Sequence, residues 1–243
     1  MATARHARVV AAEMLGPQTR MLELACDEPL GFVGGQYVIV DSGQVLASGK
    51  AVKRAYSVLS RDDEQQRFRI AVKRIADGPA SSYLHTVDVG GTIRFSGPWG
   101  KLRPDDGATG RTLVLATDTG ITAALGLVQS AQFRRLARAT VFIWLQPSPD
   151  EFVPDAMVAE LLPRDLGEVH FAAVPSIGDR ARVPHARAVL AGVLERGPLG
   201  QAFIAGDGAI NYALLDDLVA MGVPATRDSV ESFFNMPKKS AAA

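Results

Sequence analysis

The sequence predicts a protein of two domains: an antiparallel six-stranded β-barrel, followed by an α/β domain with a five-stranded parallel sheet. Up to about Arg103 the chain consists of short apolar-rich segments, several of them alternating, which are separated by Gly, Pro, Asp and Ser. That rhythm is typical of a small barrel or sandwich. Beyond Arg111 strand-like and helix-like segments alternate four times and end in a strand, which predicts a parallel sheet with helices on both faces.

The first domain is expected over residues 1–104. Its six expected strands are ARVVAAEML, TRMLELAC, GQYVIVDS, RAYSVLS, RFRIAVKR and GTIRFSG. One short helix, ASSYLHTV, interrupts them between the fifth and the sixth. The polar, Gly-rich stretch RPDDGATGR, residues 103–111, is the expected linker.

The second domain is expected over residues 111–243. Its first strand, TLVLA, is a continuous apolar run, as expected for a strand that is buried on both faces. The other expected strands are ATVFIWL, EVHFAAV, QAFIAG and SVESFFN, and helices are expected in ITAALGLVQSAQFRRLA, DAMVAELL, ARAVLAGVLERG and AINYALLDDLVAMG. Sheets of this kind bind ligands past the carboxyl ends of their strands, which here are the segments ATDTG and AGDGA.

Composition removes several classes of function. Lys and Arg number 26 and Asp and Glu number 26 among 243 residues, so a zero net charge gives no reason to expect nucleic acid as a partner. Cys26 is the single cysteine, which rules out a disulfide framework and a four-cysteine iron–sulfur site within the chain. The four histidines are too scattered to suggest a metal site, and no apolar run approaches a membrane span. We therefore expect a cytoplasmic protein, without membrane or metal, that is a monomer or a weak dimer.

The segment RAYSVLS carries the first functional signal. Alternation places Arg54 and Tyr56 on one side of the strand and Ala55 and Ser57 on the other. Alone, this pattern describes an ordinary exposed barrel strand with a solvated arginine. It is preceded by GGQYV and followed by GPAS, residues 78–81, and GPWG, residues 97–100. Together, in this order and at this spacing, the motifs resemble the ferredoxin–NADP reductase family of flavoproteins, over nearly the whole chain.

The resemblance implies that the barrel holds FAD. Arg54, a fixed cation with forked donors, would bind the pyrophosphate, and Tyr56 would lie flat against the isoalloxazine ring. Ser57 would place its hydroxyl near flavin N5, where hydride arrives. The start of the short helix would present backbone N–H groups to the phosphates. The implied FAD-binding residues are Arg54, Ala55, Tyr56, Ser57, Val72, Lys73, Gly78, Ala80 and Ser81.

The implied nicotinamide-nucleotide loop, ATDTGITA, departs from the family pattern. Thr117, Thr119 and Gly120 match it, but Asp118 stands where a glycine is expected. An aspartate adds bulk and a charge of the wrong sign for a pyrophosphate, and its expected local role is that of a helix N-cap. In AGDGAI, Gly206, Asp207 and Gly208 are implied cofactor-binding residues, whereas Ala205 replaces the family's cysteine beside the nicotinamide.

The last strand, in ESFFN, resembles the family's terminal Glu-x-aromatic segment. Glu231 is implied as a proton relay near Ser57, and Phe233 as the cover of the second ring face, so these three are the implied catalytic residues. The tail after Phe234 is expected to return toward the flavin. NAD is not distinguished from NADP: LQPSPDEF has no Arg or Lys, whereas Arg180 or Arg182 could hold a 2′-phosphate.

Two functional hypotheses follow. The first is an FAD-dependent NAD(P)H oxidoreductase that passes electrons to a protein acceptor: a ferredoxin, a flavodoxin or an oxygenase component. The second is a flavin-bearing electron-transfer module of a larger complex with a vestigial nicotinamide site, which Asp118 and Ala205 motivate. Reduction of the flavin by NADPH or NADH discriminates between them.

Overall fold

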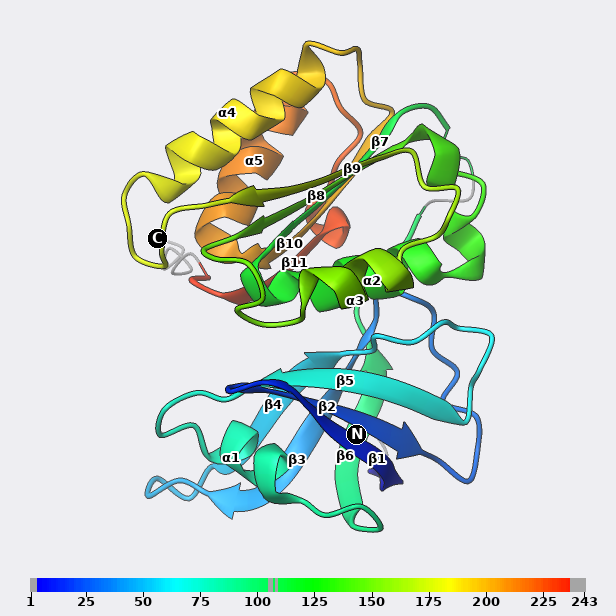
Figure 1. The fold of residues 1–243 in the computed structure, drawn as a ribbon, viewed down its shortest axis with the longest axis vertical. Helices are drawn as coiled ribbons and strands as arrows, with labels where there is room; N and C mark the ends of the chain where they lie inside the picture. The colour runs from blue at the N-terminus through cyan, green and yellow to red at the C-terminus, as the bar shows by residue number, and fades with distance from the viewer. Residues whose placement is uncertain (1–3, 105–106, 108, 237–243) are drawn as a thin grey trace, which may run out of the picture.

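The computed structural model describes residues 4–104, 107 and 109–236, and Figure 1 shows two domains, one above the other. The lower domain is a six-stranded antiparallel sheet in the order β4-β3-β6-β1-β2-β5, and its end strands β4 and β5 contact each other. The sheet therefore curls into the predicted barrel. Its strands are β1 (Arg5–Gly16), β2 (Thr19–Ala25), β3 (Tyr37–Val45), β4 (Ala51–Ser57), β5 (Arg67–Lys73) and β6 (Thr92–Trp99).

The expected short helix is α1 (Pro79–Thr86), which packs against β3, β4 and β5. Pro79 occupies the first turn, where its missing N–H group leaves no helical hydrogen bond unmade. Leu84 turns inward to join the barrel core with Phe68 and Phe95, whose rings meet edge to face at 5.7 Å.

The upper domain is a five-stranded parallel sheet in the order β11-β10-β7-β8-β9. The chain leaves β7 toward β8 and β9 and then crosses back to β10 and β11, so the strand order reverses between β7 and β10. In such sheets this reversal is where ligands bind. The strands are β7 (Thr112–Thr117), β8 (Thr140–Gln146), β9 (Glu168–Ala173), β10 (Gln201–Asp207) and β11 (Val230–Phe234).

Helices cover both faces of this sheet, as predicted (Figure 1). One face carries α2 (Ile121–Gln129) and α3 (Asp155–Leu161), whose apolar residues pack with those of β7, β8 and β10. The other face carries α4 (Arg182–Leu194) and α5 (Gly208–Ala220), which pack on the alternate residues of the same strands. Because both faces are covered, every residue of β7, β8 and β10 is buried.

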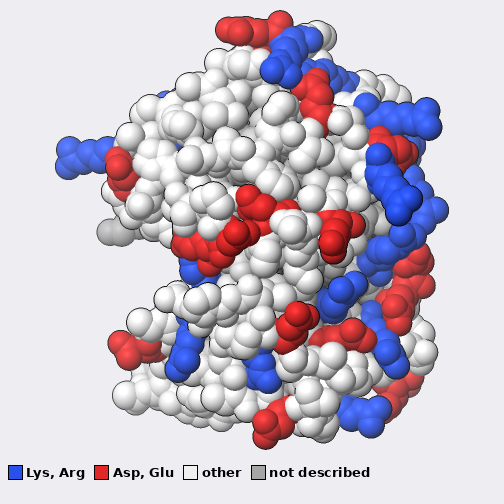
Figure 2. Space-filling view, viewed as in Figure 1, with Lys and Arg blue, Asp and Glu red and all other residues white. Residues whose placement is uncertain are grey.

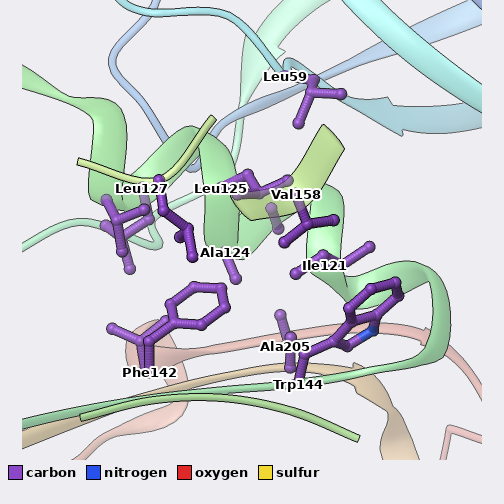
Figure 3. Packing of buried hydrophobic residues seen from close by; sticks show 14 of the residues in the cluster. Leu59, Ile121, Ala124, Leu125, Leu127, Phe142, Trp144, Val158 and Ala205 are labelled. Atoms are coloured by element: carbon purple, nitrogen blue, oxygen red, sulfur yellow. The ribbon is translucent and has the colours of Figure 1, made fainter. Parts of the chain in front are cut away.

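One apolar core crosses the boundary between the domains. The cluster around α2 includes Leu59 and Leu102 of the barrel side, and Figure 3 shows Leu59 directed toward α2. The backbones also meet closely: a Cβ atom on Gly34 would lie 2.1 Å from the carbonyl oxygen of Gly126, and one on Gly126 would lie 2.5 Å from that of Val58. The two domains are therefore fitted directly against each other.

One predicted helix is shorter than expected. The helical pattern of ITAALGLVQSAQFRRLA predicted a helix beyond residue 130, but α2 ends at Gln129. Ser130 takes an extended conformation (ψ 151°), and short 3₁₀ turns follow. The carboxylate of Asp62, from the barrel side, accepts a hydrogen bond from the backbone N–H of Ala131 at 3.0 Å. This contact between domains competes with continuation of the helix.

The domain boundary at 104–111 stays a prediction, although β6 and β7 lie on either side of it. Residues 105, 106 and 108 of the expected linker lie outside the described residues, as does the expected returning tail over 237–243. Among the residues that are described, no helix is long and apolar enough to cross a membrane, and no group of three or more His, Cys, Asp or Glu side chains is arranged to hold a metal ion.

Candidate functional site

The outer strand β4 presents Arg54 and Tyr56 beside α1. The guanidinium of Arg54 is exposed, and its Nη1 donates to the neighbouring Lys53 carbonyl at 2.8 Å, which leaves other donors of the fork for a ligand. Tyr56 is half-buried and packs against the barrel core. Burial raises the pKa of its hydroxyl to about 12, although the nearby Arg54 opposes that rise. Both interpretations of Tyr56, core packing and ring binding, are therefore compatible with its position.

Ser57 ends β4 where α2 of the second domain approaches. It is 3% exposed, and its hydroxyl is buried without a hydrogen-bond partner among the described residues. A buried hydroxyl without a partner is costly, on the order of 1–3 kcal/mol, and therefore needs an explanation. A bound molecule that supplies the missing partner is one such explanation.

Glu231 of β11 faces the same boundary. It is largely buried, and burial raises the pKa of its carboxyl to about 7. Burial raises the pKa of the Tyr37 hydroxyl, and the negative charge of the ionised Glu231 carboxyl raises it further. Tyr37 pairs with Ser57 in the antiparallel register of β3 and β4. Tyr37 thus lies opposite Ser57 in the sheet and within electrostatic reach of Glu231, whereas the expected proximity of Glu231 to Ser57 stays a prediction.

A buried amide holds β11 in this position. Asn211, in the first turns of α5, is 0% exposed and donates from Nδ2 to the carbonyl of Glu231 at 3.1 Å and to the Ser232 hydroxyl at 3.0 Å. Sequence reasoning missed both Asn211 and Tyr37. The signal for Asn211 was a polar residue on the buried side of an otherwise apolar helix; for Tyr37 it was an aromatic residue at the start of a barrel strand.

Phe233 packs against the apolar cluster around α2 and stays half-buried. The pairing of β10 with β11 shifts register at this point, because Gly206 pairs with Ser232 whereas Asp207 pairs with Phe234. Phe233 is therefore the extra residue of a bulge, which re-aims its side chain. Its role as a cover for a ring stays a prediction.

The turn before α1 is braced by Ser81. Its hydroxyl accepts from the backbone N–H of Ile75 at 3.1 Å and donates to the Gly78 carbonyl at 3.0 Å. A Cβ atom on Gly78 would lie 2.7 Å from that hydroxyl, so the turn requires glycine there. Ser81 is thereby committed to shaping the turn, and Ala80 beside it is 2% exposed. Only the backbone N–H groups of this first turn stay suited to a phosphate.

Val72 and Lys73 contribute differently from one another. The Val72 side chain is 0% exposed in the barrel core, and its carbonyl lies 2.9 Å from Nε2 of His85. Only the backbone of Val72 is therefore available to a ligand. Lys73 forms an ion pair with Glu151 of the second domain, which links the two domains.

The other predicted site lies at the carboxyl ends of β7 and β10. There Thr117 accepts, through its hydroxyl, the backbone N–H of Asp207 at 2.8 Å. A Cβ atom on Gly120 would lie 2.3 Å from the carbonyl oxygen of Ala205. A Cβ atom on Gly206 would lie 2.2 Å from the carbonyl oxygen of Thr117. These glycines permit close packing of strand, turn and helix.

Two further residues complete this edge. The closest atoms to a Cβ on Gly208 would be backbone atoms of Asn235 and Phe234, from 2.7 Å. Thr119 is half-buried, and its carbonyl accepts from the Thr122 hydroxyl at 3.0 Å. The space near the glycines of both segments is thus occupied by the protein's own backbone.

A buried ionic cluster fills the centre of this edge; we call Asp118, Arg182 and Asp207 the switch-point cluster. Arg182 donates from Nη2 to Asp118 at 2.5 Å, from Nε to Asp207 at 3.1 Å and from Nη1 to the carbonyl of Pro175 at 2.6 Å. The three side chains are 3%, 6% and 2% exposed for Arg182, Asp118 and Asp207 respectively. Oδ1 of Asp118 is buried without a partner among the described residues.

The cluster corrects two expectations. Asp118 is not a helix N-cap: neither the 3₁₀ turn over residues 118–120 nor α2 has a side-chain cap, and the Asp118 side chain instead pairs with Arg182. Arg182 is not available for a 2′-phosphate, because it is buried between two carboxylates. The backbone of Asp118 has φ +52°, the left-handed region, which explains why glycine suits this position.

The residues that the resemblance assigns to FAD fit that cofactor by their donor chemistry. Arg54 has free guanidinium donors, α1 begins with small residues beside it, and Ser57 has an unsatisfied hydroxyl. The switch-point cluster fits a dinucleotide less well, since a guanidinium between two carboxylates leaves a formal charge of minus one. The guanidinium of Arg182 is already bonded to three groups of the protein.

Comparison with known proteins supports the prediction that the barrel binds FAD. Residues 6–103 match the model of the oxidoreductase FAD-binding domain. The chain is 37% identical over 142 residues to ferredoxin–NADP reductase B of Sorangium cellulosum, covering 58% of this chain and 56% of that protein. It is 26% identical over 137 residues to the reductase subunit of an aromatic O-demethylase of Amycolatopsis, covering 54% and 40%. The chain thus spans about half the length of these relatives.

Solved structures share the whole fold. The ferredoxin reductase of carbazole 1,9a-dioxygenase superimposes with a TM-score of 0.74 at 23% identity, over 96% of this chain and 69% of that one. A siderophore-interacting protein of Acinetobacter baumannii superimposes with a TM-score of 0.71 at 16% identity, over 96% and 90%. At these identities the likeness concerns the fold. Residues 6–103 are therefore an oxidoreductase FAD-binding domain, and the chain as a whole has the two-domain fold of a ferredoxin reductase.

Proposed function

We propose that the chain is an FAD-dependent NAD(P)H oxidoreductase that passes electrons to a redox protein. The observation that supports this proposal is the largely buried carboxyl of Glu231, which lies within electrostatic reach of Tyr37, the register partner of Ser57, and whose pKa of about 7 suits proton transfer near neutral pH. Bound FAD would supply the redox chemistry, since it can accept a hydride and release electrons singly.

The chain's own residues hold and orient the reacting partners. Arg54 binds the pyrophosphate, and the first turn of α1 adds backbone donors. Ser57 gains a partner for its buried hydroxyl when the cofactor binds. Glu231 holds or releases a proton at its carboxyl, which is largely buried.

The acceptor is proposed from the relatives. They include a ferredoxin–NADP reductase and the reductase subunits of an aromatic O-demethylase and of a glycine betaine monooxygenase. Each name denotes a reductase, two denote reductase subunits, and one of those belongs to a monooxygenase. A ferredoxin, a flavodoxin or an oxygenase component is therefore the acceptor that we propose for this chain, which is expected to act as a monomer or weak dimer in the cytoplasm.

Anaerobic titration of the purified yellow protein tests the proposal. NADPH or NADH should bleach the flavin absorbance near stoichiometry, and a one-electron acceptor protein added afterwards should restore it. Dithionite serves as the control that the flavin is reducible. A flavin that dithionite bleaches but neither nucleotide does would overturn the proposed electron donor.

A second candidate function has one observation in its favour. The switch-point cluster occupies the edge where the nucleotide would bind, which favours a flavin-bearing electron-transfer module that receives electrons from another protein. In that case the flavin would be reduced by a reduced ferredoxin or a partner subunit and not by either nucleotide. The titration above separates the two functions.

A further inference from the structure

The switch-point cluster lies where the strand order of the second domain reverses. Asp118 follows β7 directly, and Asp207 is the last residue of β10. These two strands are neighbours in the sheet, and the chain leaves them in opposite directions. Open α/β sheets bind ligands in the crevice outside this point, where helix N-termini and loop amides meet an anion.

In this chain the anion is part of the protein. The Asp118 carboxylate is buried beside the 3₁₀ turn that leads into α2, and it pairs with Arg182. The N-terminus of α5 is capped by Asp207, whose Oδ1 accepts from the Ala209 N–H at 2.9 Å and from the Asn235 amide at 3.1 Å. The start of α5, where an anion would find backbone donors, is therefore already capped by one internal carboxylate, and a second carboxylate lies beside it through their shared partner Arg182.

The cation of the cluster is also committed. Arg182 donates hydrogen bonds to Asp118, Asp207 and the carbonyl of Pro175, and it is 3% exposed. A dinucleotide phosphate at this edge would add negative charge to a group that already carries a formal charge of minus one. Desolvated like charges at close range repel strongly.

We infer that the net negative charge of the switch-point cluster opposes nucleotide phosphates at the carboxyl ends of β7 and β10. Asp118 thereby gives the chain a low affinity for the phosphates of the donor nucleotide. The inference rests on the proposed function, because it concerns the electron-donor side of that same site. The inference makes Asp118 a specificity-determining residue. With Asp118 removed, Arg182 retains Asp207 alone as a carboxylate partner, and the cluster no longer carries a formal negative charge that opposes a phosphate.

Two variants keep the fold while changing the charge. Asp118→Gly suits the left-handed backbone, and the bond from Trp144 Nε1 to the residue 118 carbonyl, 3.0 Å long, involves only the backbone. Asp118→Asn keeps an acceptor for Arg182 and tolerates the same backbone conformation. The matched control is Asp217→Asn, which removes an aspartate from the exposed Arg187–Asp217 pair on α4 and α5, roughly 13 Å along α5 from its start at about 1.5 Å per residue.

The experiment measures binding of NAD⁺, NADP⁺ and adenosine to the oxidised flavoprotein by isothermal titration calorimetry. We expect both Asp118 variants to bind NAD⁺ or NADP⁺ at least tenfold more tightly than the parent, with adenosine affinity unchanged and Asp217→Asn equal to the parent. Equal or weaker binding by both variants, or an equal gain for adenosine, would overturn the inference. Absence of binding in parent and variants alike would also overturn it.

A different measurement, bleaching of the parent flavin by a nucleotide, tests the proposed function. Bleaching of the parent flavin by NADPH or NADH supports that function whatever the variants do, so an inference that fails leaves it intact. If only the Asp118 variants are bleached, the inference stands, and the parent chain is the module of the second candidate function.

Discussion

The two ligand-facing edges of this protein differ in what they leave unsatisfied. At the barrel edge, Arg54 has free donors and the Ser57 hydroxyl is buried without a partner among the described residues. At the second edge, Arg182 bonds three protein groups and Asp207 bonds Arg182, Ala209 and Asn235. Spare donors, which an anionic ligand needs, therefore distinguish the first edge from the second, where the buried Oδ1 of Asp118, an acceptor, lacks a partner among the described residues.

The largest effect is expected from breaking the ion pairs of the switch-point cluster. Arg182→Met removes the cation between two buried carboxylates, and breaking a buried ion pair in this way costs about 3–5 kcal/mol. Urea unfolding should show this loss in the free energy of unfolding. Arg187→Met, which removes the arginine of an exposed pair on the same helix, should change it little. Equal losses in both variants would mean that the cluster does not stabilise this edge.

Glu231→Gln tests the barrel edge through the pH dependence of stability. Burial raises the pKa of Glu231 to about 7 in the folded state, so the folded protein holds this proton between about pH 4.5 and 7 while the unfolded chain does not. The free energy of unfolding of the parent therefore falls as pH rises through that window, by up to about 3 kcal/mol from this one carboxyl. The variant should gain stability over the parent at pH 8 and gain none at pH 4, as measured by thermal unfolding.

The same variant should also slow reduction of the flavin by a nucleotide, by about 100-fold if the carboxyl transfers a proton. Stopped-flow traces at pH 7 measure this rate, and FAD occupancy serves as the control, because Glu231 is not proposed to hold the cofactor. A reduction rate equal to that of the parent would remove Glu231 from the proposed chemistry.

Arg54→Ala tests the free donors of the barrel edge. Loss of charge-assisted bonds worth about 1.5–3 kcal/mol should weaken FAD binding by roughly 10- to 150-fold, while the exposed strand position tolerates alanine. The ratio of flavin to protein absorbance measures occupancy. Arg94→Ala is the control: this exposed arginine of β6 pairs with Asp41 of β3, and the variant should retain flavin. Full flavin retention in Arg54→Ala would contradict the assignment.

The smallest expected effect belongs to Ser57→Ala. Its hydroxyl has no partner among the described residues, so its removal should leave the stability of flavin-free protein unchanged or slightly higher. Reduction of the bound flavin should slow by about fivefold, the equivalent of one hydrogen bond of about 1 kcal/mol. A marked loss of stability without flavin would show that the hydroxyl already has a structural partner.

Much of the fold followed from local pattern. The alternation of the barrel strands and the apolar runs such as TLVLA predicted both sheets, and the helix over residues 79–86 was expected from ASSYLHTV. The end of α2 at Gln129 was not, because the bond from Ala131 to Asp62 joins residues that lie 69 positions apart. A sequence pattern of helical period carries no information on such a distant partner.

The same limit applies to the site. Arg54, Ser57 and Glu231 were identified by motif, but the partners that define their chemistry, such as Tyr37, come from other strands. Asp118 was noticed as a departure, and its local role as a cap was wrong because its partner Arg182 lies 64 positions further on. Distant pairing decides whether a charged residue is free, and that pairing becomes visible only in three dimensions.

The contact between Gly34 and Gly126 has a consequence for how the protein unfolds. With the domains touching backbone to backbone and sharing the apolar cluster that reaches Leu59, neither half can open without exposing the core of the other. The chain should therefore melt as one cooperative unit. A methyl group at Gly126 would wedge the two halves apart, and calorimetry of Gly126→Ala should then resolve two separate transitions, one for each half.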